Sequence, residues 1–358
     1  MIAKQRIRLP GGLIAGMLAA MALQAQQEKP VPQKDSAALY RTDALWHNKE
    51  RELHYKPEGT DFVKVSGNRR FNRALYGTHT GFRVETGDLP EFALYMPGMG
   101  GNLQFILRKG EETKPLTAAA HIKTVYSPGA MRYEITDPWL GNTVLHIKVL
   151  ALAAAEGMII EARTQTLSPA DRVSPDIVLS WKYGGASGKK FSRNGDIGAD
   201  PESSFYLKPE NCVGNEYTVS ENSFRLSYAA GKRSLAGVFP GDAMVTNADT
   251  PEQGAATRQK APLMEGRFEI DGNTPRYLAI YNPDKSAALN YKGLPAVFAA
   301  AEKARTTLAG RVKLVTPDPY INTLGGALAV AADGIWEDPT FLHGAVAWRM
   351  RLPAWRGA

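Results

Sequence analysis

Aromatic and hydrogen-bonding side chains are concentrated in the last stretch of the chain, residues 334–358. Three of the six tryptophans of the chain lie in this stretch. Aromatic rings can stack on the C–H faces of a pyranose, while polar and charged groups bond its hydroxyls. The pattern therefore predicts a sugar-binding site, and its candidate residues are Trp336, Glu337, His343, Trp348, Trp355 and Arg356. The alternative interpretation is that these tryptophans are core residues of a domain that begins here.

Several other motifs fail as chemical sites because of their spacing. Gly184–Lys190 has three residues between its glycines and no Ser or Thr after its lysines, so a hairpin loop is predicted instead of a phosphate loop. Pro97–Gly101 precedes a strand and is predicted to form a tight turn. Asp196, Asp200 and Glu202 do not match the spacing of a calcium loop.

Metal-ligand and nucleophile patterns are also missing from the sequence. The six histidines have no paired ligand spacing, and no Gly-x-Ser-x-Gly motif occurs. We therefore expect no metal and no cofactor. Cys212 is the only cysteine, so the chain cannot form an internal disulfide bond.

A second stretch dense in aromatic and polar groups is Phe71–Gly77, which we consider together with Trp46 and Arg83. These residues either line a cleft that faces a neighbouring domain or form a β-edge packed on a loop. The sequence favours the packed edge, because aromatic and basic side chains are also common at the edges of sheets.

The first 25 residues have the order of a secretory signal peptide. The basic residues Lys4, Arg6 and Arg8 precede an apolar run, Leu13–Ala25, that is too short to span a bilayer. We predict cleavage after Ala25, a flexible leader over 26–45, and a periplasmic or secreted protein without stable membrane insertion. Cleavage would lower the formal charge from +7 to +4. The basic residues are scattered, so no nucleic-acid partner is expected.

Residues 46–292 have the pattern of an all-β domain. Short alternating apolar runs recur between turn signals, among them Leu103–Leu107, Met131–Ile135, Leu145–Val149, Phe224–Tyr228 and Tyr277–Tyr281. Alternation with one apolar face indicates two antiparallel sheets packed face to face. We predict a mainly β fold, with a large, supersandwich-like antiparallel β-sandwich.

The period then changes to that of a helix. Over 294–308 the residues Val297, Phe298, Ala301, Ala304 and Leu308 share one face. The opposite face is predicted to carry Glu302, Lys303 and Arg305. Pro295 suits the first turn of this helix and Gly310 suits its C-terminal cap. A connecting segment is thus expected over 293–316.

A second helix is predicted over 320–333. It is small and apolar on nearly all sides, so its sequence is typical of a helix that other elements bury. The boundary before it is marked by Pro317 and Pro319.

The order of these elements resembles that of six-hairpin, (α/α)6-toroid glycoside hydrolases. The motifs that carry the resemblance are Asp318–Asn322, Ala332–Trp336, Phe341–Gly344 and Trp348–Gly357, which are similar to the first-hairpin region of secreted Bacteroidetes proteins. The stretch Arg70–Gly77 is similar to their uncharacterised N-terminal sandwich. The resemblance implies that 317–358 is the start of a toroid and that carbohydrate is the partner.

The same resemblance implies hydrolysis by an inverting or retaining pair of carboxylates. Twelve helices need on the order of 200 residues, and only residues 317–358 follow the connecting segment. Asp333, Glu337 and Asp338 are not expected to be catalytic. We therefore expect an N-terminal portion of a secreted glycoside hydrolase that is inactive alone, with its catalytic carboxylates unassigned. The alternatives are a non-catalytic carbohydrate-binding or scaffold module and, less favoured by the domain order, a polysaccharide lyase.

Overall fold

The residues that the computed structural model describes are 53–166, 173–174, 176–190, 202–248, 260–270 and 274–341. They belong to one compact unit that begins at Leu53. The predicted signal peptide and leader lie outside them. Within this described part, no helix combines the length and apolar character needed to cross a membrane.

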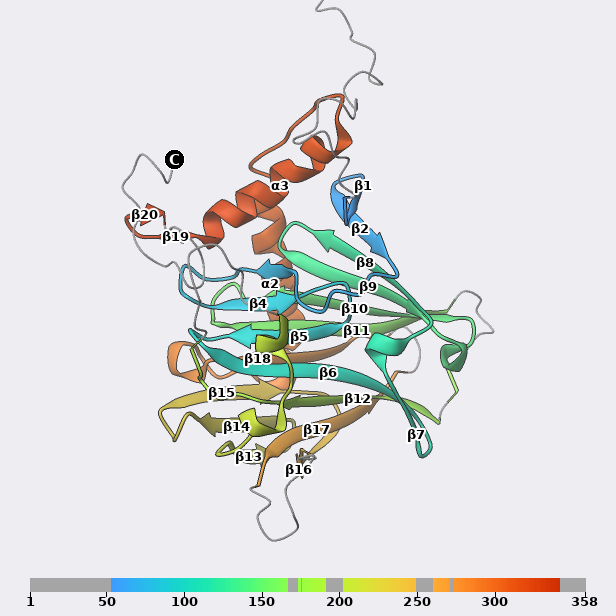
Figure 1. Ribbon diagram of the computed structural model, residues 1–358, viewed down its shortest axis with the longest axis vertical. Helices are drawn as coiled ribbons and strands as arrows, with labels where there is room; N and C mark the ends of the chain where they lie inside the picture. Colours follow the sequence, from blue (N-terminus) through green and yellow to red (C-terminus); the bar gives the residue numbers. More distant parts are fainter. Residues whose placement is uncertain are drawn as a thin grey trace, which may run out of the picture. The chain divides into compact units, whose positions relative to one another are not determined.

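The larger of two sheets has ten strands, and each strand runs antiparallel to its neighbours (Figure 1). In spatial order these strands are β1 (Lys56–Glu58), β2 (Asp61–Val65), β8 (His121–Ser127), β9 (Ala130–Thr136), β10 (Thr143–Ala151), β11 (Gly157–Thr166), β18 (Arg276–Tyr281), β15 (Arg233–Val238), β14 (Ser223–Tyr228) and β13 (Glu216–Ser220). Val149 of β10 lies opposite Met131 and Ile160 of its two neighbours.

The second sheet has eight strands and is also antiparallel. Its members are β16 (Asp242–Asn247), β17 (Pro262–Glu269), β12 (Ile177–Gly184), β6 (Met99–Lys109), β5 (Glu91–Tyr95), β4 (Arg83–Thr86) and β3 (Arg73–Leu75), with β7 (Glu112–Pro115) paired to β6. Two helices, α2 (Leu294–Ala309) and α3 (Pro319–Gly334), precede a small hairpin of β19 (Trp336–Glu337) and β20 (Thr340–Phe341). The prediction of a mainly β chain with two antiparallel sheets and a helix near the C-terminus is confirmed.

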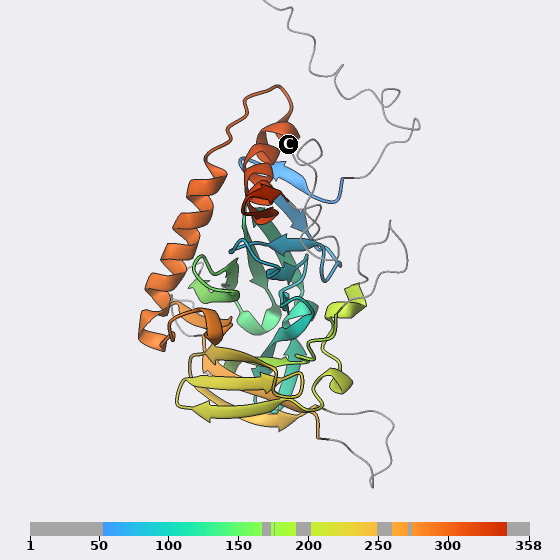
Figure 2. The same cartoon turned by 90° about the vertical axis from the view of Figure 1, so that its left-hand side faces the viewer.

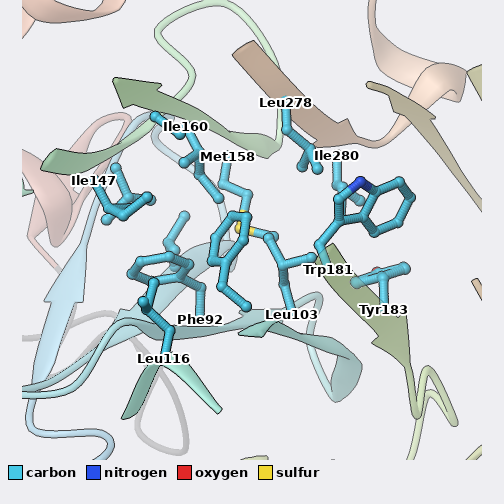
Figure 3. Close-up of a cluster of buried hydrophobic side chains, with 14 of the residues drawn as sticks. Phe92, Leu103, Leu116, Ile147, Met158, Ile160, Trp181, Tyr183, Leu278 and Ile280 are labelled. Atoms are coloured by element: carbon cyan, nitrogen blue, oxygen red, sulfur yellow. The ribbon is translucent and has the colours of Figure 1, made fainter. Parts of the chain in front are cut away.

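The two sheets share one apolar core. Figure 3 shows Met158, Ile160 and Leu278 of the larger sheet pointing toward Leu103 and Trp181 of the smaller one. All of these side chains are at most 3% exposed. Burying side chains of this size contributes about 1.5–3 kcal/mol each. The predicted alternation of Leu103–Leu107 and Met131–Ile135 is confirmed, because each apolar position faces this core.

Strands β10, β11 and β18 are buried on both faces, which the predicted one-sided alternation did not include. Leu278 and Ile280 face the core between the sheets, whereas Ala279 and Tyr281 lie in a second cluster with Phe298 of α2. Helix α2 packs on the outer face of these three strands (Figure 2). One-sided alternation over Tyr277–Tyr281 assigns one face of this strand to solvent, and that part of the prediction is wrong because α2 covers the outer face.

Helix α2 begins and ends within a residue of its predicted bounds. Phe298, Ala301 and Leu308 are buried as expected, and Pro295 occupies its first turn. Arg305 was predicted on the solvent face, but it is buried, with 7% of the residue exposed. Its guanidinium Nη1 donates to the backbone oxygen of Tyr76 at 3.0 Å, which provides a polar partner inside an otherwise apolar contact.

Helix α3 also agrees with its predicted range. The side chain of Asp318 caps its first turn by accepting from the backbone N–H of Tyr320 at 2.8 Å. The side packed on the sheets includes Thr323, whose hydroxyl donates to the backbone oxygen of Gly59 at 3.0 Å. On the other side, Ile321, Leu324 and Leu328 are 41–52% exposed. No residue that the structure describes covers this apolar side.

The two glycine-rich motifs lie against each other. The turn between β5 and β6 contains Gly98, whose φ is +127°. A Cβ atom on Gly98 would lie 2.6 Å from the backbone oxygen of Gly188, so only glycine allows this approach. Met99 and the segment 188–189 exchange backbone hydrogen bonds of 2.8 and 3.0 Å. The turn predicted at Pro97–Gly101 is confirmed, and the glycines have a packing role.

Candidate functional site

Of the predicted sugar-site residues, the structure describes Trp336 fully and Glu337 by its backbone. The half-buried ring of Trp336 meets Phe341 edge-on, with centroids 4.9 Å apart and planes at 72°. Glu337 pairs with Thr340 in the β19–β20 hairpin. The other candidates lie outside the described residues; they are His343, Trp348, Trp355 and Arg356.

The hairpin follows directly from a polar contact between α3 and the sheets. One carboxylate oxygen of Asp333, in the last turn of α3, lies 3.0 Å from the Nε2 of His79. Its other oxygen lies 3.7 Å from the Nη1 of the buried Arg305. Gly334 packs directly on the ring of Tyr76. The end of α3 is therefore fixed to the β3–β4 connection and to α2.

The same β3–β4 connection forms part of a polar pocket of about 300 Å³. Loops of both sheets meet here, namely the β3–β4, β5–β6, β10–β11 and β14–β15 connections and the segment after β18. Antiparallel pairing brings these connections to one end of the sheets. The residues around the pocket include Thr80, Met96, Glu156, Tyr228, Lys232, Arg233, Asn282, Asp284 and Lys285. We call this site the loop pocket.

Glu156 is the most buried charged group of the loop pocket. Its carboxylate accepts from Asn282 Nδ2 at 2.9 Å and from Lys285 Nζ at 3.1 Å. Burial alone would raise the pKa of this carboxyl group, but hydrogen bonds from Asn282, Thr80 and Lys285 outweigh burial and hold the pKa below its usual value. Glu156 is thus an ionised, positioned acceptor and not a proton donor at neutral pH.

The cations of the loop pocket differ in how far they are neutralised. Lys285 is paired with Glu156. Arg233 donates through Nη1 to the backbone oxygens of Met96 and Pro97, and no carboxylate among the described residues forms an ion pair with it. Lys232 is exposed and has no ion pair within the described ranges. The pocket therefore combines fixed acceptors with two uncompensated positive charges.

Sequence reasoning missed the loop pocket. The sequence analysis assigned no role to Glu156, which lies between β10 and β11. The available signal was an acidic residue in a tight turn between two strongly apolar strands, where an unpaired carboxylate is costly. His79, which has no paired ligand spacing in the sequence, is exposed, and its ring contacts Asp333.

The stretch Phe71–Gly77 is an edge packed on a loop, as the sequence favoured. Phe71 is buried against Phe205, with centroids 5.5 Å apart. Arg70 forms a paired contact with Glu91, at 2.7 and 2.5 Å, and its guanidinium lies 3.6 Å from the centroid of the Tyr206 ring. Trp46 lies outside the described residues.

A separate buried carboxylate, Asp88, connects the start of the unit to the turn after β4. Asp88 is fully buried. It accepts from Tyr55 Oη at 2.6 Å, from His54 Nε2 at 2.7 Å and from the backbone N–H of Arg69 at 3.0 Å. Asn72 Nδ2 is a fourth, longer contact at 3.4 Å. This network bonds the start of the unit to the turn after β4.

Three buried carboxyl groups predict how stability depends on pH. Burial raises the pKa values of Asp88, Asp137 and Glu156, but hydrogen bonds to each carboxylate lower them further, and all three end below their usual values. Such groups stabilise the fold at pH values above the pKa of the unfolded chain, about 4, and this contribution disappears as pH falls through the folded pKa.

We therefore expect that these three groups do not change the denaturant midpoint between pH 5 and 8. Below about pH 4 their protonation should lower the midpoint. Urea titrations monitored by tryptophan fluorescence at pH 7, 5, 4 and 3 test this prediction. Glu156→Gln should make the decline below pH 4 shallower. A midpoint that stays unchanged down to pH 3 would contradict it.

Metal ligands do not assemble in the part of the chain that the structure describes. No group of three or more His, Cys, Asp or Glu side chains there could hold an ion. Asp196 and Asp200 of the calcium-like stretch lie outside it.

The chain matches a known protein family over most of its sheets. The model of the domain of unknown function DUF4450 matches residues 96–302, more than half of the chain. The chain belongs to the DUF4450 family. The DUF4450 match includes most of the loop pocket, from Met96 to Lys285, whereas Thr80 and Asp333 lie outside it.

Many solved structures resemble the DUF4450 chain, and two of them are a glucoamylase and an alpha-mannosidase. The DUF4450 chain gave no match among curated proteins. It is similar to a bacterial glucoamylase complexed with acarbose, at 10% identity and a TM-score of 0.41, covering 79% of this chain and 46% of that one. It is also similar to a family GH92 alpha-mannosidase from Bacteroides thetaiotaomicron, at 10% identity and a TM-score of 0.26, covering 80% and 38%. The chain spans less than half the length of either structure.

Aromatic side chains of the DUF4450 chain are directed inward. Among the residues that the structure describes, every Phe, Tyr and Trp side chain is buried or half-buried. Even Tyr206 and Trp139 are half-buried, beneath Arg70 and Lys114 respectively. The described surface of the sheets therefore presents no fully exposed aromatic ring for a sugar to stack on.

Proposed function

We propose that this chain is the N-terminal portion of a secreted glycoside hydrolase acting on poly- or oligosaccharides. In this proposal residues 46–292 form a supersandwich-like β-sandwich, 293–316 connect it to the next domain, and 317–358 begin an (α/α)6 toroid. The sandwich is a scaffold that positions the helical domain, and the chain does not hydrolyse glycans alone. Its catalytic carboxylates lie in the part that follows.

The observation that carries this proposal is the uncovered apolar side of α3. Ile321, Leu324 and Leu328 recur at intervals of three and four residues and are 41–52% exposed. A soluble protein does not normally leave such a stripe in water, because further helices or a partner would bury it favourably. The C-terminal end of the same helix is held on the sheets by Asp333, so α3 offers a fixed first surface for packing.

The competing function is a carbohydrate-binding module without a catalytic role. Such modules commonly stack sugar rings on exposed aromatics, and the described surface of the two sheets presents none. This observation supports the scaffold over the binding module. Saturable binding of a neutral oligosaccharide to residues 46–292 alone would reverse that preference.

Activity measurements with and without a helical domain test the proposal. The purified chain should release no reducing sugar from a panel of plant and host glycans, whereas a version extended by the DNA-encoded sequence downstream should do so. Turnover by the chain alone would contradict the scaffold role. A downstream sequence with no helical hairpins would contradict the toroid.

The apolar side of α3 gives a second, physical test. Leu324→Glu combined with Leu328→Glu should reduce self-association of the purified chain, because exposed apolar area drives association. The matched control is Lys303→Glu, an exposed position on α2. Unchanged sedimentation of the double variant would show that α3 is not a packing surface.

Export is part of the same proposal. A signal peptide over 1–25 would leave a mature chain that starts at Gln26. N-terminal sequencing of protein recovered from the periplasm or medium should begin there, and recovery only from the cytoplasm would contradict export.

A further inference from the structure

The loop pocket has the charge pattern of a site for a small anion that also carries hydroxyl groups. Lys232 has no ion pair among the described residues, and Arg233 is held by the backbone oxygens of Met96 and Pro97. A guanidinium fixed by neutral carbonyls keeps its full charge and its remaining N–H donors. These two cations lie side by side in the chain at the start of β15.

Acceptors are fixed beside these cations. Asp284 is exposed and accepts from the hydroxyl of Ser234, which lies 3.1 and 3.0 Å from its two carboxylate oxygens, and from Arg225 Nη2 at 3.5 Å. Glu156 is held by Asn282 and Lys285. Ionised carboxylates accept up to four hydrogen bonds, so both groups retain capacity for ligand hydroxyls.

The balance of charges selects among anions. A doubly charged free anion would be attracted by Lys232 and Arg233 but repelled by Asp284 and Glu156 in the same pocket. A sugar ring with one carboxylate and several hydroxyl groups suits both kinds of residue, because its carboxylate can pair with the cations and its hydroxyls can donate to the acidic side chains. The volume of about 300 Å³ lies at the lower end of the range for ligand sites, which suits one sugar ring.

We propose that the loop pocket binds one hexuronate unit of a glycan, with its carboxylate at Lys232 and Arg233 and its hydroxyls at Asp284. The sugar identity rests on the proposed carbohydrate function, whereas selection of a carboxylate follows from the pocket alone. The loop pocket shares the β3–β4 connection with the contact between His79 and Asp333, so a sugar bound here would lie on the side of the sheets where α3 ends.

Calorimetric titration of the full chain with methyl β-glucuronide and methyl β-glucoside tests the carboxylate directly. The two ligands differ only at C6. We expect saturable binding of the glucuronide at one site per chain, at least tenfold tighter than the glucoside, and weakened by added salt. Equal affinities would overturn the proposal.

Two further ligands separate a sugar from a free anion. Acetate lacks the ring hydroxyls and inorganic phosphate lacks the sugar, so each should bind at least tenfold more weakly than the glucuronide. Tighter binding of phosphate than of the glucuronide would overturn the assignment of a sugar.

Matched lysine variants locate the binding. Lys232→Ala should weaken glucuronide binding at least tenfold, whereas Lys109→Ala should not change it. Both lysines are exposed, and Lys109 ends the strand β6 that begins beside the pocket, so it lies at the far end of the sheet. Equal effects of the two variants would overturn the location. The chain could bind the glucuronide while the version extended by the downstream sequence hydrolyses no glycan. That result would refute the proposed hydrolase but not the proposed uronate site.

Discussion

Asp88→Ala is expected to lose about 3–5 kcal/mol of unfolding free energy, the range for removing one partner of a buried charged network. Asp88 is fully buried, and its carboxylate is the common acceptor for Tyr55, His54 and the backbone of Arg69. Removing the carboxylate leaves the buried Tyr55 hydroxyl without this acceptor and deprives the Arg69 N–H of its partner. Urea unfolding monitored by tryptophan fluorescence measures the loss.

Two variants define how the Asp88 result is interpreted. Glu111→Ala removes an exposed acid in the β6–β7 turn and should change stability by less than about 0.5 kcal/mol. Asp88→Asn keeps the shape and one acceptor oxygen, so its loss should fall between the two. If Asp88→Ala costs no more than Glu111→Ala, the network does not hold this part of the fold.

The segment around Asp88 also connects the two sheets to each other. The backbone oxygen of Asp88 accepts from the hydroxyl of Thr124 in β8, and the hydroxyl of Tyr133 in β9 donates to the backbone oxygen of Gly87. The turn after β4 in the smaller sheet is therefore bonded to two strands of the larger one. Loss of Asp88 should thus loosen the contact between the sheets, in addition to the segment around Tyr55.

Much of the architecture could be predicted because it depends on local periodicity. Leu103–Leu107 and Met131–Ile135 alternate, and both are strands with alternate residues in the core. The change to a 3.6-residue period at Leu294 marks α2 within a residue of its observed start. These patterns repeat every two or four residues, so a short window of sequence contains the whole signal.

The remaining features depend on contacts between distant residues. Periodicity placed Arg305 on the solvent side of α2, because it reports which residues share a face and not what covers that face. The covering atom is the backbone oxygen of Tyr76, more than 200 residues earlier. For the same reason, the alternation of β18 gives no sign that α2 covers the face with Ala279 and Tyr281.

The loop pocket could not be found from local sequence either. It is assembled from connections that are spread between Thr80 and Lys285. Each contributes one or two polar residues of kinds that loops commonly carry, and only the antiparallel topology gathers them at one end. The predicted aromatic cluster shows the opposite case, because its residues are close in sequence, and the contact between Trp336 and Phe341 is formed within one short hairpin.

Asp333→Ala is expected to release the end of α3 from the sheets. Arg305 has a side chain that is only 8% exposed, and among the described residues Asp333, 3.7 Å away, is the one carboxylate paired with it. Removing one partner of a fully buried pair costs about 3–5 kcal/mol. Asp333 is about one quarter exposed, so water can partly replace it, and we expect about 2 kcal/mol.

Hydrogen exchange is the appropriate measurement for Asp333→Ala, because the effect should be local. The amides of α3 should exchange about 30-fold faster at 2 kcal/mol, whereas those of β9 and β10 should be unchanged. Thr307→Ala, at an exposed position of α2, is the control and should leave both sets unchanged. His79→Ala should have a smaller effect, because this half-exposed ring makes a solvent-screened contact.

A double variant separates the charge from the packing. In Arg305→Met the buried charge is absent, so adding Asp333→Ala should cost much less than it does in the natural chain. Equal costs in the two backgrounds would show that Asp333 acts through its own packing or its contact with His79. A reduced cost would mean that the pair of Asp333 and Arg305 fixes the angle at which α3 leaves the sheets, and with it the direction in which any following helices would pack.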